Sequence, residues 1–403
     1  MKDKKKLQLI IVAICLLLML AGCGSGKALE PESDGNTPPE NKQTEFINGI
    51  FHITTGGRYI LSGEHEGQIL IEAASTDVVQ LVLDRLTLHS PNGPVILTSG
   101  SRRVELILSD GTVNTITDGK HTDSAGNAAI YIGSDMVVNG NGTLNITSVG
   151  HGIKSETNVT INEGSLTITA KGKGITANGS VLVKGGVINI IDSDEGIEGL
   201  NVTIAGGSID VFARDDGINA RDPGGTINPA IYIRFTGGNT QVHVEGADVD
   251  GIDSNGDIFL EGGMLRVNGP STRMASAIDL DGTFLITGGD LVTAGSVQNI
   301  SGQSTQPFFG ISFSQQLPSG TNIEVRDARG STMQRYTTRS SFSVSGFTSP
   351  SFVIGETYSL YINDAKVEDI TLTGIITTIG GNNQGGGRGR GVNQQAGIYI
   401  LQR

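Results

Sequence analysis

The sequence predicts an all-β protein: a parallel β-solenoid with coils of about 22 residues, followed by a small antiparallel β domain. The first observation is a Gly-Ile step that returns at a nearly constant spacing. The step glycines are Gly152, Gly174, Gly196, Gly217 and Gly251. The second is that runs rich in Val, Ile, Leu and Thr separate the steps, and no stretch has the period of an ordinary helix. The third is the composition, with 59 Gly in 403 residues and no Trp. A fixed period of this length is typical of stacked repeats.

The chain begins with a segment that predicts export. Residues 1–22 combine a basic start with an apolar run that is too short for a comfortable membrane span. The run ends in the letters LAGC, which look like a bacterial lipobox and predict cleavage before Cys23 with a lipid on its sulfur. We therefore expect a lipid-anchored protein on the extracellular face of the cell membrane, and the alternative is an uncleaved anchor. Cys15 lies in the removed segment, so a disulfide is not expected.

Composition divides the remaining chain into four parts. Residues 23–45 are rich in Pro, Ser, Asn and charge and predict a flexible tether. Residues 46–300 contain the strands of the solenoid, with less regular first coils. Residues 301–380 lose the repeat and predict the C-terminal β domain. Residues 381–403 form a Gly-rich, low-complexity tail. One coil is longer than the others, which predicts an insertion of about a dozen residues between Gly217 and Gly251.

The charge is acidic and is concentrated on a few coils. The whole chain carries −13, and loss of residues 1–22, with four Lys and one Asp, leaves −16. Between Asp192 and Asp257 there are thirteen acidic residues and three Arg, a net charge of −10. Such a surface excludes nucleic acid as an expected partner.

Equivalent positions of successive coils stack at about 4.8 Å in a parallel solenoid. The position before the step glycine therefore builds a column of His151, Lys173, Glu195, Asp216 and Asp250. The preceding position adds Asp194 and Asp215. The position after the step isoleucine adds Lys154, Glu198, Asn219, Asp253 and Asp279. Two carboxylates at this spacing repel by about 3 to 4 kcal/mol at an effective dielectric near 20, so the acidic rungs need a cation or raised pKa values.

Calcium is the cation that fits these residue types best. Asp, Glu, Asn and turn carbonyls supply hard oxygen ligands, and Cys/His sets for zinc are absent from the sequence. The densest run, from Asp248 to Asp257, resembles half of an EF-hand loop, but it lacks the Glu at the twelfth position and flanking helices. The alternative is an acidic, solvated turn that keeps the solenoid soluble.

Three lysines precede the acidic coils and raise the question of catalysis. Lys154, Lys171 or Lys173 could serve as a general base beside a bound cation. The alternative, which we favour, is that Lys173 pairs with Glu195 one rung away, and we assign no catalytic residue. His151 stands at the head of the column and is expected to be structural or solvated.

The repeated DDGI, DGIDS and GG-x-(L/I)-x-(I/V) units, with the lipobox and the segment ETYSLYIND, resemble the bacterial carbohydrate-binding-domain family of secreted β-helix proteins. The resemblance covers roughly residues 50 to 380 and implies a right-handed parallel β-helix related in fold to pectate lyases. It also implies bound calcium and attachment without cleavage to plant-cell-wall polysaccharide, such as cellulose or polygalacturonate. It assigns the calcium role to Asp194, Glu195, Asp215, Asp216, Asp248, Asp250 and Asp253. GHGIKS and GKGITA depart from the family pattern because they lack acids.

These observations predict a calcium-dependent, non-catalytic polysaccharide-binding surface lipoprotein. Two other functions stay open: a calcium-dependent polysaccharide lyase, and a structural or adhesive envelope protein. Sugar-binding surfaces usually stack rings on exposed aromatic side chains. The candidates for that role are Tyr131, Tyr232 and Phe235, for each of which packing in the core or at an edge is the favoured alternative.

Overall fold

The computed structural model describes residues 45–121, 126–222, 231–269 and 275–380. The chain separates into Met1–Pro39 and Glu40–Arg403, and every described residue belongs to the second unit. Cys23, the predicted targeting segment and the Gly-rich tail lie outside the described residues. Within the described ranges, no helix is long and apolar enough to cross a membrane.

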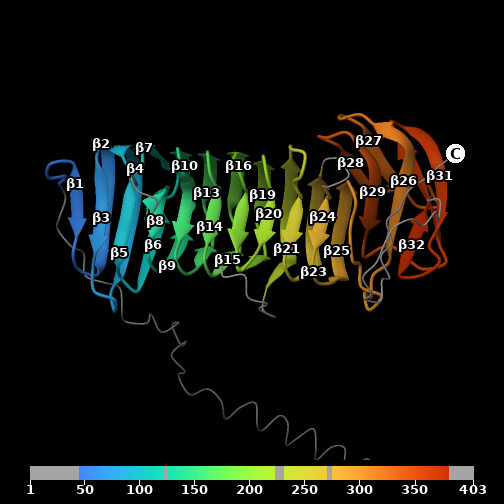
Figure 1. Ribbon diagram of the computed structural model, residues 1–403, viewed down its shortest axis with the longest axis horizontal. Coiled ribbons are helices and arrows are strands. Elements are labelled where there is room, and N and C mark those ends of the chain that lie inside the picture. Colours follow the sequence, from blue (N-terminus) through green and yellow to red (C-terminus); the bar gives the residue numbers. More distant parts are fainter. Residues whose placement is uncertain (1–44, 122–125, 223–230, 270–274, 381–403) are drawn as a thin grey trace, which may run out of the picture. The chain divides into compact units, whose positions relative to one another are not determined.

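The described chain is all-β, and its first part is a solenoid of stacked coils (Figure 1). One side of the coils is a ten-stranded sheet in which every neighbouring pair is parallel. We call it the step sheet, because five of its strands contain or follow the Gly-Ile steps. Its strands are β1 (Ile50–Ile53), β3 (Gln68–Glu72), β5 (Ile96–Gly100), β8 (Ala128–Ile132), β11 (His151–Ser155), β14 (Ile175–Ala177), β17 (Ile197–Gly199), β20 (Ile218–Ala220), β22 (Ile252–Ser254) and β24 (Ile278–Leu280).

Two further strand segments complete each coil, and both belong to one larger sheet of 18 strands. Some strands are long enough to supply both segments of their coil: β2 (Gly57–Glu66), β4 (Val78–Asn92), β21 (Tyr232–Val244), β23 (Asp257–Asn268) and β25 (Phe284–Ala294). The others supply one segment: β6 (Arg103–Leu108), β7 (Val113–Lys120), β9 (Asp135–Asn139), β10 (Thr143–Ser148), β12 (Val159–Ile161), β13 (Ser165–Ala170), β15 (Ser180–Val183), β16 (Val187–Asp192), β18 (Asn201–Ile204) and β19 (Ser208–Ala213). The prediction of a parallel β-solenoid is confirmed.

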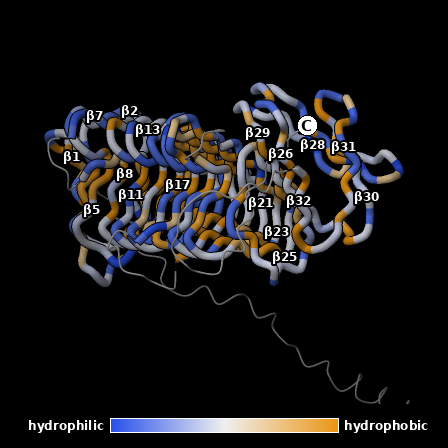
Figure 2. The backbone as a smooth tube through the Cα atoms, turned by 45° about the vertical axis from the view of Figure 1, so that its right-hand side comes forward, coloured by the Kyte–Doolittle hydropathy of each residue, from blue (hydrophilic) through white to orange (hydrophobic). Residues whose placement is uncertain are grey.

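A continuous apolar core fills the coils from Phe51 to Phe308. Hydrophobic residues alternate with hydrophilic ones along each coil, because successive side chains of a strand point to opposite faces (Figure 2). The step isoleucines stack in register and are fully buried: Ile153, Ile175, Ile197, Ile218, Ile252 and Ile278. Removing one of them, as in Ile218→Ala, is expected to cost about 2 to 5 kcal/mol of unfolding free energy.

The two glycine marks of the repeat have different causes. A Cβ on the step glycine Gly196 would lie 2.2 Å from the carbonyl oxygen of Gly217, so this position requires a close approach of two backbones. The second glycine of each GG pair, such as Gly207 with φ +88°, adopts a conformation that other residues disfavour. The step glycine therefore allows the coils to stack closely, and the second glycine of the GG pair allows the chain to turn between two strands of a coil.

The long coil has its extra residues in two places. The chain takes twelve residues from Ala220 to Tyr232, where the preceding coil takes two from Gly199 to Asn201. The remaining excess follows Val244. Between these two places, Tyr232–Phe235 is a regular part of β21 and pairs with β18.

The C-terminal part has a separate core and its own antiparallel sheet, as predicted. The sheet contains β27 (Asn322–Arg326), β28 (Thr332–Thr337), β30 (Thr357–Ile362) and β31 (Ala365–Thr371), in the order β28-β27-β30-β31. Three further strands extend the large sheet of the solenoid: β26 (Phe308–Leu317), β29 (Phe342–Thr348) and β32 (Ile376–Ile379). The strand β29 is antiparallel to β25 of the last coil, whereas β26 and β32 are parallel to each other.

Candidate metal centre

One row of side chains follows the outer face of the step sheet along the whole stack. Each member is the register neighbour of the next, and we call the row the outer column. Its members are His52, Leu70, Leu97, Tyr131, Lys154, Thr176, Glu198, Asn219, Asp253 and Asp279. The column changes from apolar and aromatic through basic to acidic, and it confirms the predicted stacking of the residues that follow the step isoleucines.

The residues that precede the step glycines also stack as predicted. The amide of Gly196 donates to the carbonyl of Asp216 (3.0 Å), and the amide of Gly217 donates to that of Asp250 (3.0 Å). Because Gly196 directly follows Glu195, its hydrogen bond to Asp216 places Glu195 and Asp216 on neighbouring coils. The amide of Asp215 donates to the carbonyl of Asp194 (2.9 Å), so these two acids are neighbours as well.

Several of these side chains also accept hydrogen bonds from backbone amides of the next coil. Oδ1 of Asp216 accepts a hydrogen bond from the amide of Asp250 (2.9 Å), and Oδ1 of Asp250 accepts one from the amide of Ser276 (2.5 Å). His151 Nδ1 accepts from the amide of Lys173 in the same way (2.9 Å). The sequence predicted only a calcium role for Asp216 and Asp250, although an acceptor side chain recurs at this repeat position, whereas His151 was expected to be structural or solvated.

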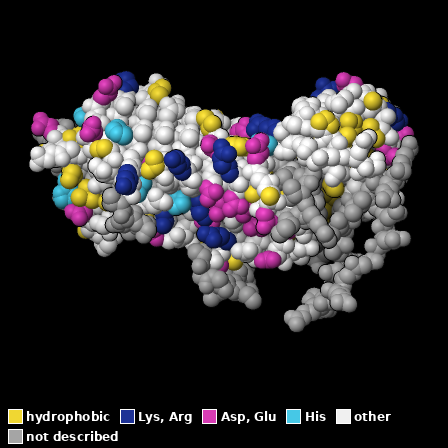
Figure 3. All heavy atoms as spheres, turned by 45° about the horizontal axis from the view of Figure 1, so that its top comes forward, with side chains coloured by type: hydrophobic (Ala, Val, Ile, Leu, Met, Phe, Trp, Pro, Cys, Tyr) yellow, Lys and Arg dark blue, Asp and Glu magenta, His cyan; other side chains and the backbone are white. Residues whose placement is uncertain are grey.

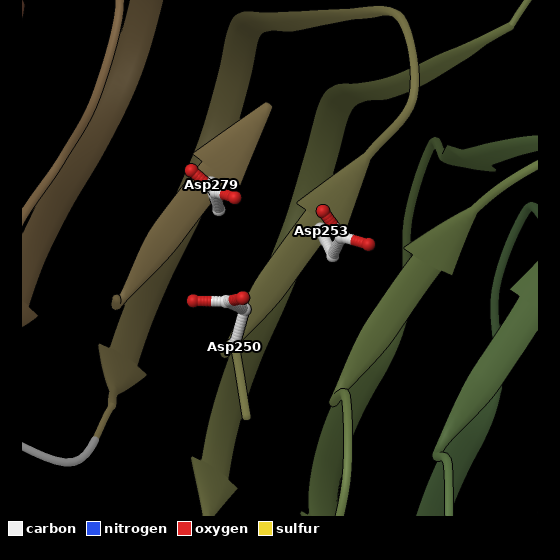
Figure 4. A group of neighbouring side chains, drawn as sticks. All are labelled: Asp250, Asp253 and Asp279. Atoms are coloured by element: carbon white, nitrogen blue, oxygen red, sulfur yellow. The ribbon is translucent and has the colours of Figure 1, made fainter. Parts of the chain in front are cut away.

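Three aspartates form the group best suited to hold a metal ion. Asp250, Asp253 and Asp279 each offer one carboxylate oxygen, and these oxygens all lie within 4.8 Å of one another. Figure 4 shows the three carboxyl groups on the same side of strands β22 and β24. Asp279 stood in the predicted column but not among the seven ligands that the family resemblance implied. The other five predicted ligands lie outside this group: Asp194, Glu195, Asp215, Asp216 and Asp248.

Burial and mutual repulsion raise the pKa values of these acids in the metal-free protein. Burial, together with the charges of Asp216 and Asp250, raises the pKa of Asp253 to about 8. Burial also raises the pKa of Asp250 to about 7 and that of Asp216 to about 6. The pKa of Asp279 is raised for the same reason. A bound divalent cation would reverse these shifts, because it favours the ionised form.

A buried side-chain oxygen without a hydrogen-bond partner in the described chain, Oδ1 of Asn219, belongs to the neighbouring rung of the outer column. Asn219 is the register neighbour of Asp253 and is 5% exposed. Its Nδ2 donates to Asp216 Oδ2 (3.2 Å) and lies 3.4 Å from Glu195 Oε2. Its Oδ1 is buried and has no hydrogen-bond partner among the described residues. A buried acceptor without a partner costs free energy, and an amide oxygen is a ligand that calcium accepts.

One or two coils earlier, the outer column is charged but internally neutralised. Lys173 Nζ lies 3.0 Å from Glu195 Oε1 and also contacts Glu198, which in turn pairs with Arg221. Burial and the neighbouring Glu198 together raise the pKa of Glu195 to about 7. Burial opposes ionisation of Glu198 too, but hydrogen bonds from Glu195 and Lys173 lower its pKa. We call these four residues the lysine cluster.

A small pocket opens beside the lysine cluster. It has a volume of about 150 Å³, and its walls include His151, Lys154, Lys173 and Arg221. Burial, together with the charges of Lys173 and Lys154, lowers the pKa of His151 to about 4. Figure 3 shows a face of the molecule on which acidic side chains gather over the middle of the stack, with Lys, Arg and His close by.

The three aromatic candidates differ in position. Phe235 is 2% exposed and belongs to the core. Tyr131 is half-buried in the outer column, where its hydroxyl donates to Glu156 (2.8 Å) and Lys154 Nζ lies 5.7 Å from its ring centre. Tyr232 lies in β21, on another side of the coils, beside Arg234. Only Tyr131 therefore shares the outer column with the aspartates.

A long parallel β-solenoid with a polar outer column is an architecture suited to binding extended chains. The carbohydrate-binding domain-containing protein family matches residues 48–302, more than half of the chain. The chain therefore belongs to this family, as its sequence resemblance predicted.

Two individual comparisons accompany the family match. A carbohydrate-binding domain-containing protein of Acetivibrio thermocellus is 30% identical over 166 residues, which cover 36% of this chain and 57% of that relative. The chain thus spans little more than half the length of this relative. A solved structure described as the polysaccharide lyase-like protein from C. thermocellum, gadolinium derivative, has 25% sequence identity and a TM-score of 0.42, with 65% of this chain and 91% of that chain covered. The fold assignment itself comes from the strand pairing described above.

Proposed function

We propose that this protein is a non-catalytic polysaccharide-binding surface lipoprotein whose binding depends on calcium. The observation that carries the proposal is the group of Asp250, Asp253 and Asp279, with its ligand oxygens within 4.8 Å of one another on the outer column. The site belongs to a chain of the carbohydrate-binding family.

Charge balance supports a cation at the three aspartates. Carboxylates at this spacing repel by several kcal/mol unless a proton or a cation lies between them. Calcium takes six to eight oxygen ligands, and the aspartates would supply three of them. The unpartnered Oδ1 of Asn219, backbone carbonyls and water are candidates for the others. Carboxylate and amide oxygens favour calcium over zinc.

The rest of the outer column supports a polysaccharide as the ligand. A glycan chain lying along the stack would cross one rung of the sheet about every 4.8 Å. Leu70, Leu97 and Tyr131 would contact the apolar faces of its sugar rings, and the calcium ion would coordinate its hydroxyl or carboxylate oxygens. Cellulose and polygalacturonate are the glycans that the family resemblance suggests.

Binding without cleavage is supported by the ion pairs of Lys154 and Lys173. A lyase needs a base within hydrogen-bond reach of the proton that it removes. Lys173 pairs with Glu195 and Glu198, and Lys154 lies 3.2 Å from Glu156. Both lysines are thus engaged by carboxylates. A calcium-dependent lyase stays the second candidate, and a structural or adhesive envelope protein is the third.

The test is retention on insoluble glycans. The full chain carrying Cys23→Ala, which cannot be lipidated, is incubated with cellulose and with pectin in calcium or in EDTA. We expect retention on pectin in calcium and loss of that retention in EDTA. Asp253→Asn should behave in calcium as the parent does in EDTA, whereas the exposed control Asp364→Asn should be retained normally. Equal retention under all conditions would remove calcium from the proposal, and no retention on either glycan would favour the adhesive function.

The same test addresses the membrane anchor separately. Metabolic labelling of the unmodified chain with a radioactive fatty acid should mark the protein, and Cys23→Ala should abolish the label.

A further inference from the structure

We infer a second sugar subsite, independent of metal, in a pocket between the last coils of the solenoid and the C-terminal sheet. This inference rests on the proposed polysaccharide binding and extends it to the domain beyond residue 302, where the family match ends. The pocket has a volume of about 110 Å³. We propose that it takes one uncharged pyranose ring, seated partly inside.

Three strands build the pocket. Met264 and Arg266 come from β23, Asp290 comes from the neighbouring strand β25, and Met264 is in register with Asp290. Gln334 and Arg335 come from β28 of the C-terminal sheet, which crosses over these coils. The pocket therefore exists only because the C-terminal domain packs on the solenoid.

The segment after β28 is firmly attached to the coils. Arg339 makes two hydrogen bonds to the carboxylate of Asp210, at 2.9 and 2.8 Å. Its amide donates to Oδ1 of Asn268 (2.8 Å), and Nδ2 of Asn268 donates to the hydroxyl of Tyr336. These contacts join positions that lie up to 129 residues apart in sequence. The wall of the pocket is thus pre-organised, which reduces the entropic cost of binding.

A buried oxygen of the pocket lining has no partner. Gln334 is 8% exposed, and its Nε2 donates to the carbonyl of Thr348 (2.7 Å) and lies 3.3 Å from Asp290 Oδ1. Its Oε1 accepts no hydrogen bond from any described residue. This orientation of the amide is fixed by the acceptors around Nε2. A hydroxyl donor that enters the pocket would satisfy the remaining oxygen.

The charged groups of the pocket have mixed signs. Arg266 Nη1 donates to Asn239 Oδ1 (2.9 Å), and no carboxylate of the described chain lies within 4.0 Å of its guanidinium nitrogens. Arg335 pairs with Glu324 (2.9 Å), and Asp290 contributes a carboxylate. A sugar hydroxyl can donate to a carboxylate and accept from a guanidinium, so an uncharged polyol meets both signs. A polyanion would meet Asp290, and a metal ion would meet Arg266.

The size and the apolar surface agree with one ring. Met264 and Met333 are half-buried and line the pocket, where their flexible thioether side chains can contact the C–H face of a sugar. An apolar cavity of about 150 Å³ holds one benzene ring, so an open pocket of 110 Å³ takes most of one six-membered ring.

The experiment measures binding of cellotetraose, a neutral glucose oligomer, by calorimetry in EDTA. The proteins are the full chain with Cys23→Ala and its variants Asp290→Ala, Arg266→Met and the exposed control Arg329→Met. We expect saturable binding by the parent and the control, and at least tenfold weaker binding by Asp290→Ala and Arg266→Met. Unchanged melting temperatures show that the variants are folded.

Two results would overturn the subsite: no cellotetraose binding by the parent in EDTA, or equal affinity in the parent and both pocket variants. Polygalacturonate binding in calcium, measured on the same proteins, separates this outcome from failure of the proposed function. Arg266→Met should keep that calcium-dependent binding, and Asp253→Asn should lose it while keeping its affinity for cellotetraose.

Discussion

The lysine cluster and the aspartate group occupy the same face of the same stack, yet they balance their charges differently. In the lysine cluster, Lys173 lies between Glu195 and Glu198, and Arg221 pairs with Glu198. In the aspartate group, Asp253 and its neighbours have no Lys or Arg of the described chain within 4.0 Å. The backbone geometry is shared, since both groups stand on consecutive rungs of the step sheet.

The comparison shows that a rung of this solenoid can be neutralised in two ways. In the lysine cluster, the ammonium group of Lys173 balances the charge of the glutamates. In the aspartate group, protons or an external cation must balance the charge of the carboxylates. The coils GHGIKS and GKGITA, which lack acids in the sequence, are therefore the place where the chain supplies its own positive charge. The following predictions test this difference.

The largest effect is expected for Lys173→Met. This change removes the internal cation and leaves Glu195 buried without a charged partner, which should lower the unfolding free energy by about 3 kcal/mol. Urea unfolding at pH 7.5 in EDTA measures it. The matched control is Lys171→Met at an exposed position of the same turn, with an expected change within about 0.5 kcal/mol. If both variants lose the same stability, Lys173 is not the internal cation.

Calcium should stabilise the parent protein through the aspartate group. A ligand bound only by the folded state adds about 2.7 kcal/mol at one hundred times its dissociation constant. Thermal melts in millimolar calcium and in EDTA should therefore differ by several degrees. Asp253→Asn should abolish the difference. At pH 8.5 in EDTA, where Asp253 is largely ionised, the variant should also melt at a higher temperature than the parent because one repelling charge is lost. A calcium shift that survives in Asp253→Asn would place the ion elsewhere.

The stability of the metal-free protein should fall as pH rises from 6.5 to 8.5. The folded-state pKa values of Asp250 and Asp253, about 7 and 8, lie above the ordinary aspartate value of 3.8. Their stabilising contribution is complete below the unfolded pKa and is lost as pH rises through the folded pKa. Melts in EDTA should show the decline, and the increment due to calcium should grow over the same range, because calcium requires the ionised carboxylates. A pH-independent melt of the parent would contradict the raised pKa values.

The smallest expected effect is on catalysis, where we predict none. The full chain incubated with polygalacturonate and calcium at neutral and alkaline pH should produce no rise in ultraviolet absorbance from an unsaturated product. Lys154 and Lys173 are held by carboxylates and are poorly placed to abstract a proton. A steady rise that disappears in Lys173→Ala would instead establish the lyase function.

Much of the fold could be predicted from the sequence, because a short period fixes both the strands and their stacking. The step isoleucines and the neighbours Asp215 and Asp194 lie where the repeat predicts them. The coil containing Tyr232 was less predictable, since an insertion breaks the period and only strand pairing locates the register again.

The candidate site was predictable in part. Asp250 and Asp253 follow from the acidic repeat. Asp279 also stands in the predicted column, but the family resemblance did not extend the calcium role to it. The sequence also could not show which carboxylates pair with a lysine of the chain, as Glu195 does, and which have no such partner. That distinction depends on the reach of the Lys173 side chain across the rungs. The pocket at Gln334 needs the packing of two domains, which no local pattern encodes.

The direction of β29 has a consequence for the association of this protein with itself. A parallel stack of coils presents backbone donors and acceptors at its end, and a second copy could continue it as a template. Here the last coil strand, β25, is paired by a strand that runs the opposite way. The C-terminal domain thus covers the edge of β25, so that a second copy cannot pair with this part of the last coil. Deleting it would expose Val292 and Ala294, which are buried in its core, and would leave the last residues of β25 without a pairing strand, open to pairing with another chain.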